Sequence, residues 1–261
     1  MTPSCTTAAL TKRSAGTTIR RPGQAAVTET LEMTIQAASS PRPANISEKS
    51  RIRSYAQSRR IERLVHFTRA ENVESIVLRG LYPIELAEHE GLNLLTNDLQ
   101  RLDGHRDASS LSISTPNGRM LYKYHQVDLS AHWAVLILRP DILWEKNCAF
   151  CRHNAADRRI SSQPISSLVT VAALEGMFEG DESEDSNYWL RVYDPIDEQA
   201  EVLVFDVIEP HYIQGIAVAH ESTAANFPAF VRSRLNIICD KYLMSSREYV
   251  RMRGIQSPFW S

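Results

Sequence analysis

The stretch Gln199-Ala200-Glu201-Val202-Leu203-Val204-Phe205 places a single carboxylate inside an apolar segment. Short apolar runs rich in β-branched residues are typical of strands packed on both faces. A carboxylate is costly to remove from water, so a buried Glu is usually paired or used in chemistry. The segment therefore predicts a buried strand and leaves two roles open for Glu201, a structural ion pair or a catalytic group.

The composition of the 261 residues is that of an ordinary globular chain, with mixed charges and a net charge of −2. This length allows one domain with a sizeable core and an extension. No apolar run approaches the roughly 18 residues of a membrane span, and no long apolar segment near the N-terminus indicates a secretory signal. We therefore expect a cytoplasmic protein that does not contact a membrane.

Residues 1–55 differ from the remainder of the chain. They are rich in Thr, Ser, Ala and Pro, lack apolar periodicity, and carry 8 Lys and Arg against 3 Glu. Such a segment cannot bury enough apolar surface to offset its ordering entropy. We predict a disordered basic leader. Its composition also resembles an organelle transit peptide or a tail that holds nucleic acid loosely.

From residue 56 the pattern indicates a compact α+β domain of strands, short helices and polar loops. Apolar or alternating runs predict strands at residues 62–67, 111–114, 132–138 and 199–208. Helical spacing predicts short helices at residues 71–79, 120–125 and 168–178, the first ending at Gly80. We assign residues 56–220 to this domain and 221–261 to a C-terminal helical extension, because residues 224–250 look helical.

Two groups of residues raise the question of a metal. The segment Cys148-Ala-Phe-Cys151 has the spacing of half a zinc site, with His153 nearby, but no second cysteine pair follows. Asp98, Asp103 and His105 could also ligate a metal, although no established ligand spacing surrounds them. We expect no metal, and we expect the cysteines to be buried and reduced.

Two polar clusters suit a nucleotide. His66-Phe67-Thr68 ends the first strand just before a helix, where a ring nitrogen, a hydroxyl and free helix amides would converge on a ligand. The segment 97–106 is densely polar, and Arg101 within it could be a forked phosphate donor. Each cluster also has a plainer interpretation, a structural histidine and a solvated loop.

The order of several short blocks along residues 60–218 carries more information than any one of them. The blocks are His66-Phe-Thr-Arg-Ala-Glu-Asn-Val-Glu-Ser-Ile-Val-Leu-Arg-Gly80-Leu81, Asn97-Asp98…Arg101-Leu-Asp-Gly-His105, Leu111-Ser-Ile-Ser-Thr-Pro-Asn117…Met120, Ile142-Leu-Trp-Glu…Cys148-Ala-Phe-Cys151, Asn154-Ala-Ala and Gln199-Ala-Glu201-Val-Leu-Val. In this order they resemble the DarT family of DNA ADP-ribosyltransferase toxins. Asp157 departs from the pattern, because the family commonly has Ser at this position.

The resemblance implies an ADP-ribosyltransferase-like split β-sandwich with surrounding short helices and NAD in a central cleft. It implies catalytic roles for Glu201 and Arg101. Loss of nicotinamide develops positive charge on the ribose, which a carboxylate stabilises as it does in glycosidases. Arg101 could clamp the pyrophosphate or assist the acceptor base. The cofactor-binding residues that it implies are His66, Phe67, Thr68 and Arg101, and more weakly Ser75 and Gly80.

The implied acceptor is a base, thymine or guanine, of single-stranded DNA. Sites for single strands combine local positive charge with aromatic platforms. The DNA-binding candidates are Asn117, Met120, Tyr122, Lys123, Arg152 and Asn154. The implied partner is a macrodomain-type antitoxin that neutralises the toxin, and we expect a monomer. Alternatives are ADP-ribosylation of RNA or protein on the same fold, or a catalytically idle nucleic-acid-binding module.

Overall fold

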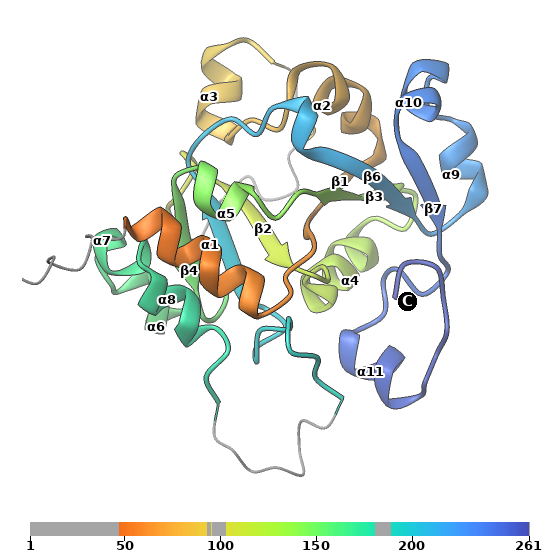
Figure 1. Cartoon of the computed structure of the whole chain (residues 1–261). Helices are drawn as coiled ribbons and strands as arrows, with labels where there is room; N and C mark the ends of the chain where they lie inside the picture. Colours follow the sequence, from red (N-terminus) through yellow and green to blue (C-terminus); the bar gives the residue numbers. More distant parts are fainter. Residues whose placement is uncertain (1–46, 93–94, 96–102, 181–188, 261) are drawn as a thin grey trace, which may run out of the picture. The chain divides into compact units, whose positions relative to one another are not determined.

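A mixed sheet organises the computed structural model, which describes residues 47–92, 95, 103–180 and 189–260 (Figure 1). Its seven strands lie in the order β4-β5-β2-β1-β3-β6-β7, and neighbours are antiparallel except for β6 and β7. The strands are β1 (Leu64–Arg69), β2 (Ser109–Ile113), β3 (Trp133–Leu138), β4 (Cys148–Cys151), β5 (Glu201–Val204), β6 (Ile213–Val218) and β7 (Asn236–Cys239).

The sheet is divided between β1 and β2. These strands share only two residue pairs, Leu64 with Ile113 and Val65 with Ser112. Beyond them β1 continues along β3, while the start of β2 pairs with β5. The halves β4-β5-β2 and β1-β3-β6-β7 thus separate after a short common ladder. The predicted fold class is confirmed. The predicted split of the β-sandwich corresponds to the separation of β1 from β2 within a single seven-strand order.

Short helices and 3₁₀ turns connect the strands. In the described part of the chain they are α1 (Glu48–Ser58), η1 (Ala70–Asn72), α2 (Val73–Arg79), α3 (Ile84–His89), α4 (Gly118–Val127), α5 (Ile142–Glu145), α6 (Arg158–Ser161), α7 (Ile165–Leu168), α8 (Val171–Gly176), η2 (Pro210–Tyr212), α9 (Glu221–Ala225), α10 (Ala229–Arg234) and α11 (Arg247–Met252). No helix among these residues is long and apolar enough to cross a membrane.

One face of the sheet carries a single continuous core. Because side chains alternate along a strand, every second residue of both halves points to this face. Leu111 and Val202 from one half and Leu64 and Leu136 from the other belong to the same buried cluster. Helices α1, α2, α5, α8 and α10 contribute apolar side chains to it. This core holds the two halves together.

The opposite face carries two separate cores. Leu121 of α4 packs with Val135 of β3 and with the C-terminal Phe259 over one half. Ile160 of α6 packs with Leu203 of β5 over the other half. Polar side chains of both halves, among them Thr68, Ser110 and Glu201, lie between these two clusters and line a cavity where the halves separate.

Helix α1 begins within the range predicted to be a leader. Ser47 caps it by accepting a hydrogen bond from the Ser50 backbone N–H, and Ile52 and Ala56 are buried. Glu48 accepts a hydrogen bond from the backbone of Val171 at the start of α8. Residues 48–55 are therefore helical, with Ile52 buried in the core, and residues 1–46 lie outside the described part. The sequence signal was two apolar residues four positions apart within a charged segment.

The C-terminal range 221–261 is not purely helical, which corrects the prediction for residues 224–250. Strand β7 lies within it and adds to the sheet edge parallel to β6. Its sequence Asn236-Ile-Ile-Cys239 is short and β-branched, and such short apolar runs cannot be assigned by periodicity alone.

Three other boundaries differ from the predictions. Strand β5 ends before Ile208, because the Asp206 side chain accepts a hydrogen bond from the Asn147 backbone N–H at 2.6 Å and ends the ladder. The helix predicted at residues 168–178 is shorter: residue 168 ends α7, and α8 runs from Val171 to Gly176 with Thr170 as its cap. The helix predicted at residues 120–125 begins earlier, at Gly118, because the Asn117 side chain caps α4 by accepting a hydrogen bond from the Met120 backbone N–H.

Candidate functional site

A cavity of about 810 Å³ lies where the halves of the sheet separate. This volume falls within the range of small-molecule sites. Its wall contains residues of β1, β2, α2, α4, the segment after β4 and the segment before β5. The predicted site residues in this wall are His66, Phe67, Thr68, Asn117, Met120, Lys123, Asn154 and Glu201.

Glu201 is the first residue of β5, only 6% exposed, and part of the cavity wall. Its Oε1 accepts a hydrogen bond from Asn154 Nδ2 at 2.9 Å, and its Oε2 accepts one from the Ala155 backbone N–H at 3.0 Å. Asn154 is itself oriented, because its Oδ1 accepts a hydrogen bond from the Ala156 backbone N–H. Both carboxylate oxygens are therefore fixed by neutral donors at the edge of the cavity.

The cross-strand neighbour of Glu201 is Cys151 of β4. Burial raises the pKa of the Cys151 thiol to about 12, so at neutral pH it contributes no charge beside the carboxylate. Cys148 is also buried, and burial likewise raises its pKa to about 12. Both cysteines are free thiols.

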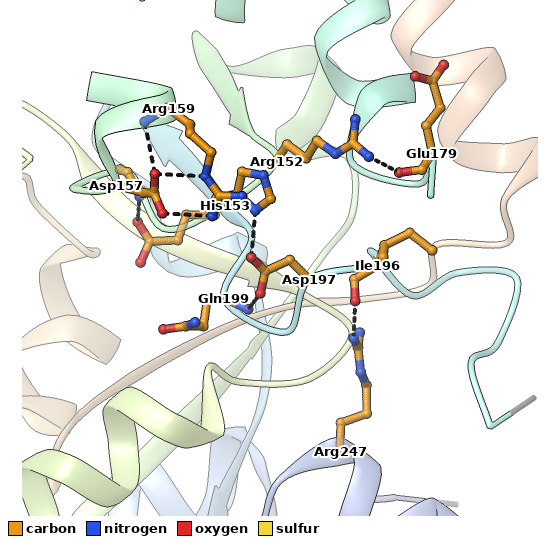
Figure 2. Close-up of polar contacts among 11 residues, drawn as sticks. Arg152, His153, Asp157, Arg159, Glu179, Ile196, Asp197, Gln199 and Arg247 are labelled. Atoms are coloured by element: carbon orange, nitrogen blue, oxygen red, sulfur yellow. Dashed lines mark hydrogen bonds and ion pairs between the residues drawn. The ribbon is translucent and has the colours of Figure 1, made fainter. Parts of the chain in front are cut away.

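Asp157 and Arg159 form a second polar group in the wall (Figure 2). The Asp157 carboxylate caps α6 and accepts hydrogen bonds from Nε and Nη2 of Arg159 at 3.0 and 2.8 Å. These hydrogen bonds lower the pKa of Asp157 well below its usual value. The departure from the family pattern thus places a paired carboxylate and guanidinium where a hydroxyl was expected.

The segment that leads into β5 also contributes to the wall through Asp197 and Gln199. Asp197 Oδ2 lies 2.7 Å from His153 Nδ1, and its Oδ1 accepts a hydrogen bond from the Gln199 backbone N–H at 2.9 Å (Figure 2). The contact ties this segment to the loop after β4, which carries the donors to Glu201.

His66 bridges the separation of the two halves. Its Nδ1 lies 2.8 Å from the carbonyl oxygen of Ser110 on β2. Because a carbonyl oxygen only accepts, Nδ1 carries the proton in this contact. Phe67 follows on β1 and forms an aromatic cluster with Tyr124 and Trp133, with ring centroids 6.0 to 6.2 Å apart.

Thr68 is the second-last residue of β1. Its hydroxyl accepts a hydrogen bond from Asn72 Nδ2 at 3.0 Å, and Asn72 also bonds the backbone of Leu95. Thr68, Asn72 and Leu95 all contribute to the wall.

Ser75 and Gly80 are not in the cavity wall. Gly80 ends α2 as predicted, with a φ of 108°. A Cβ there would lie 2.6 Å from the carbonyl oxygen of Ile208, so the glycine allows close approach of two backbone segments.

The remaining candidate site residues are Tyr122, Arg152 and Arg101. Tyr122 is 56% exposed on α4 and outside the wall. Arg152 is also outside it, and its Nη2 donates to the Glu179 carbonyl oxygen (Figure 2). Arg101 lies outside the described residues.

The metal candidates do not assemble. Asp103 contributes to the cavity wall, His105 lies 3.4 Å from an oxygen of Asp107, and Asp98 is outside the described residues. Among the residues that the structure describes, no group of three potential ligands is placed to hold a metal.

Sequence reasoning missed several wall residues. Ser110 alternates with apolar neighbours on β2, and Asp197 and Gln199 precede Glu201 at alternate positions. This period of two is a signal that could have found them. Asn72 and Tyr82 carry no comparable pattern and depend on the tertiary fold.

The divided sheet and the fixed strand carboxylate beside the cavity are the arrangement expected of an ADP-ribosyltransferase. The fold and the site therefore indicate that class of enzyme. A family model described as "ssDNA thymidine ADP-ribosyltransferase, DarT" matches residues 65–237. The chain belongs to the DarT family, as its resemblance implied. No protein with curated function matches the sequence.

The chain is also similar to solved structures of DarT proteins. Thermosipho africanus DarTG in complex with ADP-ribose is 19% identical, with a TM-score of 0.50. The match covers 70% of this chain and 51% of that one, so this chain spans about half the length of that relative. Thermus sp. 2.9 DarT, solved with NAD+, is 12% identical over 70% of this chain and 97% of that one, with a TM-score of 0.46. The same protein was also solved with ADP-ribosylated ssDNA.

Proposed function

We propose that this protein transfers ADP-ribose from NAD to thymine in single-stranded DNA and releases nicotinamide. The observation that carries the proposal is the buried Glu201 carboxylate, fixed by two donors in the wall of a cavity large enough for a nucleotide. The family description supports thymine, rather than guanine, as the acceptor.

The cavity has the chemistry that NAD requires. Its wall combines apolar side chains with hydroxyl, amide and imidazole groups, which suit ribose, adenine and carboxamide. His66, Phe67 and Thr68 are the residues that we assign to binding the nicotinamide end. Arg101 remains our candidate for positioning the pyrophosphate, because an Arg side chain hardly ever loses its proton and is a poor base.

NAD supplies an ADP-ribosyl group whose bond to nicotinamide breaks, with the bonding electrons leaving on nicotinamide and positive charge developing on the ribose. Glu201 stabilises that charge and accepts a hydrogen bond from a ribose hydroxyl. The hydrogen bonds from Asn154 and from the Ala155 backbone hold it in place, so little reorganisation is needed during the reaction. The base nitrogen forms a bond to the ribose carbon as the bond to nicotinamide breaks, and its proton passes to solvent water.

Cationic side chains in the cavity wall support a DNA strand as acceptor, although the described wall also contains Asp103, Asp157, Asp197 and Glu201 and the whole chain has a net charge of −2. Arg119, Lys123 and Arg159 contribute to the cavity wall together with the aromatic side chains of Phe67 and Tyr124. Cations beside aromatic rings are the usual composition of sites for single strands. We assign Asn117, Met120 and Asn154 to the same surface.

We further propose that the protein is the toxin of a toxin–antitoxin pair, that it acts as a monomer in the cytoplasm, and that a macrodomain hydrolase neutralises it. The similarity to Thermosipho africanus DarTG supports the pairing. The free, buried thiols of Cys148 and Cys151 fit a reducing compartment.

The test is mass spectrometry of the four homopolymeric DNA strands and an RNA strand after incubation with the full chain and NAD. We expect one ADP-ribose mass increment on oligo-dT, with equimolar release of nicotinamide. We also expect millimolar NAD to raise the Tm, because a ligand that binds the native state stabilises it. Modification of RNA alone, or of no strand, would contradict the proposal.

A further inference from the structure

A buried ionic cluster lies outside the cavity and joins α11 to the segment before β5. Asp194 and Arg247 are 3% and 1% exposed. Arg251 Nη2 donates to Asp194 Oδ1 at 3.1 Å, Arg251 Nη1 contacts Oδ2, and Arg247 Nη1 lies 3.8 Å from Oδ1. One carboxylate thus holds two arginines of the same short helix.

Arg247 makes two further contacts with the same segment. Its backbone N–H donates to Glu198 Oε1 at 2.6 Å, and its Nη2 donates to the Ile196 carbonyl oxygen at 3.3 Å (Figure 2). Helix α11 therefore contacts this segment at residues 194, 196 and 198.

The alternate residues of the segment belong to the cavity. Asp197, Gln199 and Glu201 are all in its wall, and Asp197 is tied to His153 on the opposite side (Figure 2). The even-numbered residues from 194 to 198 are thus held by α11, and the odd-numbered ones from 197 to 201 face the ligand space. The contacts of residues 194, 196 and 198 with α11 therefore restrain the turn that carries Asp197 and Gln199 and leads into β5.

The charges in this cluster are costly to bury. Burial lowers the pKa of Arg247 and raises the pKa of Glu198. Apolar side chains of similar volume could fill the same space without desolvating ions. Forked arginine contacts, unlike apolar packing, fix the orientation of the groups that they join.

We propose that Arg247 and Arg251 are positioning residues that set the segment 194–200, and through it Asp197, Gln199 and Glu201, for the transfer reaction. Both arginines lie beyond residue 237, where the family match ends, so this device is built from the chain's own C-terminal segment. The inference depends on the proposed function, because the reaction is what the segment serves.

The experiment compares Arg251→Ala, Arg251→Lys and Asp194→Asn with the wild-type protein. Arg253→Ala is the matched control, because Arg253 is exposed at the end of the same helix and lies over Tyr249. The readouts are kcat at saturating NAD, the Kd for NAD, and hydrogen exchange of residues 194–201 compared with residues 64–69. If Arg251→Ala does not fold, the other two variants provide the comparison.

For Arg251→Ala we expect kcat to fall about tenfold or more, since small displacements of reacting groups are costly. The Kd for NAD should change less than about twofold, because the residues assigned to the nicotinamide end lie on β1. Residues 194–201 should exchange faster, residues 64–69 should not, and Arg251→Lys should recover part of kcat.

An unchanged kcat in a folded Arg251→Ala variant would overturn the inference. So would an equal loss of kcat, NAD affinity and exchange protection throughout the protein, which would indicate a structural role alone. Absence of transfer by the wild-type protein would instead overturn the proposed function. Faster exchange confined to residues 194–201 in the Arg251→Ala variant would then still show that Arg251 holds this segment in place.

Discussion

The two faces of the sheet are packed differently, although the same strands form both. On one face a single apolar cluster crosses both halves and includes Leu111 and Leu136. On the other face two clusters remain apart, and the cavity lies at the separation of the halves. The comparison teaches that a sheet can be opened for a ligand on one face when the opposite face keeps its halves together. Stability should therefore depend mainly on the first face and activity on the second.

The largest effect should follow from Glu201→Gln. We expect transfer to oligo-dT to fall by about 10²- to 10³-fold, the range found when one electrostatic contact to a transition state is removed. The variant should still be stabilised by NAD in a thermal-shift assay. Glu179→Gln, at an exposed position, is the control. Transfer at the wild-type rate would remove Glu201 from the reaction.

The next largest effect separates the two faces by stability. Leu111→Ala in the continuous core should lower the free energy of unfolding by about 4 kcal/mol, and Leu203→Ala in the smaller cluster by about 2 to 3 kcal/mol. Both side chains are 1% exposed, so burial alone does not distinguish them. Urea denaturation measures the difference. Equal losses would show that the two faces contribute alike.

His66→Ala should weaken NAD binding about tenfold, because it removes a hydrogen bond across the split and an aromatic contact in the wall. Isothermal titration calorimetry with NAD gives the Kd. The control is His89→Ala, whose side chain is 82% exposed. An unchanged Kd would exclude His66 from the nucleotide site.

A smaller effect concerns pH. Burial raises the pKa of the Glu198 carboxyl above its usual value, so the folded state binds this proton more tightly than the unfolded state. That contribution is fully present below about pH 4.5 and is lost as the pH rises through the folded-state value. Glu198→Gln resembles the protonated form. As the pH falls from 7 to 5, the Tm of the wild type should therefore rise relative to the Tm of the variant. A Tm difference that does not change with pH would contradict this.

The smallest effect should come from deleting residues 1–44, which leaves α1 intact. We expect Tm and transfer rate to stay within experimental error of the wild type. Deletion through residue 58 should lower Tm, because it removes the buried Ile52 and Ala56. A transfer rate lost on the shorter deletion would show that residues 1–44 belong to the enzyme.

The sequence allowed prediction of the strands with strong apolar patterns, the stop at Gly80 and the class of the fold. It missed β4, β6 and β7, which are runs of four to six residues, and it missed α1, in which only Ile52 and Ala56 are buried; packing rather than local pattern stabilises these elements. It also allowed Glu201 to be singled out, since a carboxylate in an apolar strand is a local anomaly. The donors Asn154 and Ala155 lie beside Glu201 in space but 47 and 46 residues before it in sequence, and only the fold brings them to Glu201.

A structure of the Glu201→Gln variant with NAD bound is the most direct test. The account predicts that the dinucleotide occupies the space between β1 and β2, with its nicotinamide ribose against the side chain at position 201 and its nicotinamide beside His66. NAD bound elsewhere, or bound in this space with its ribose turned away from position 201, would contradict it.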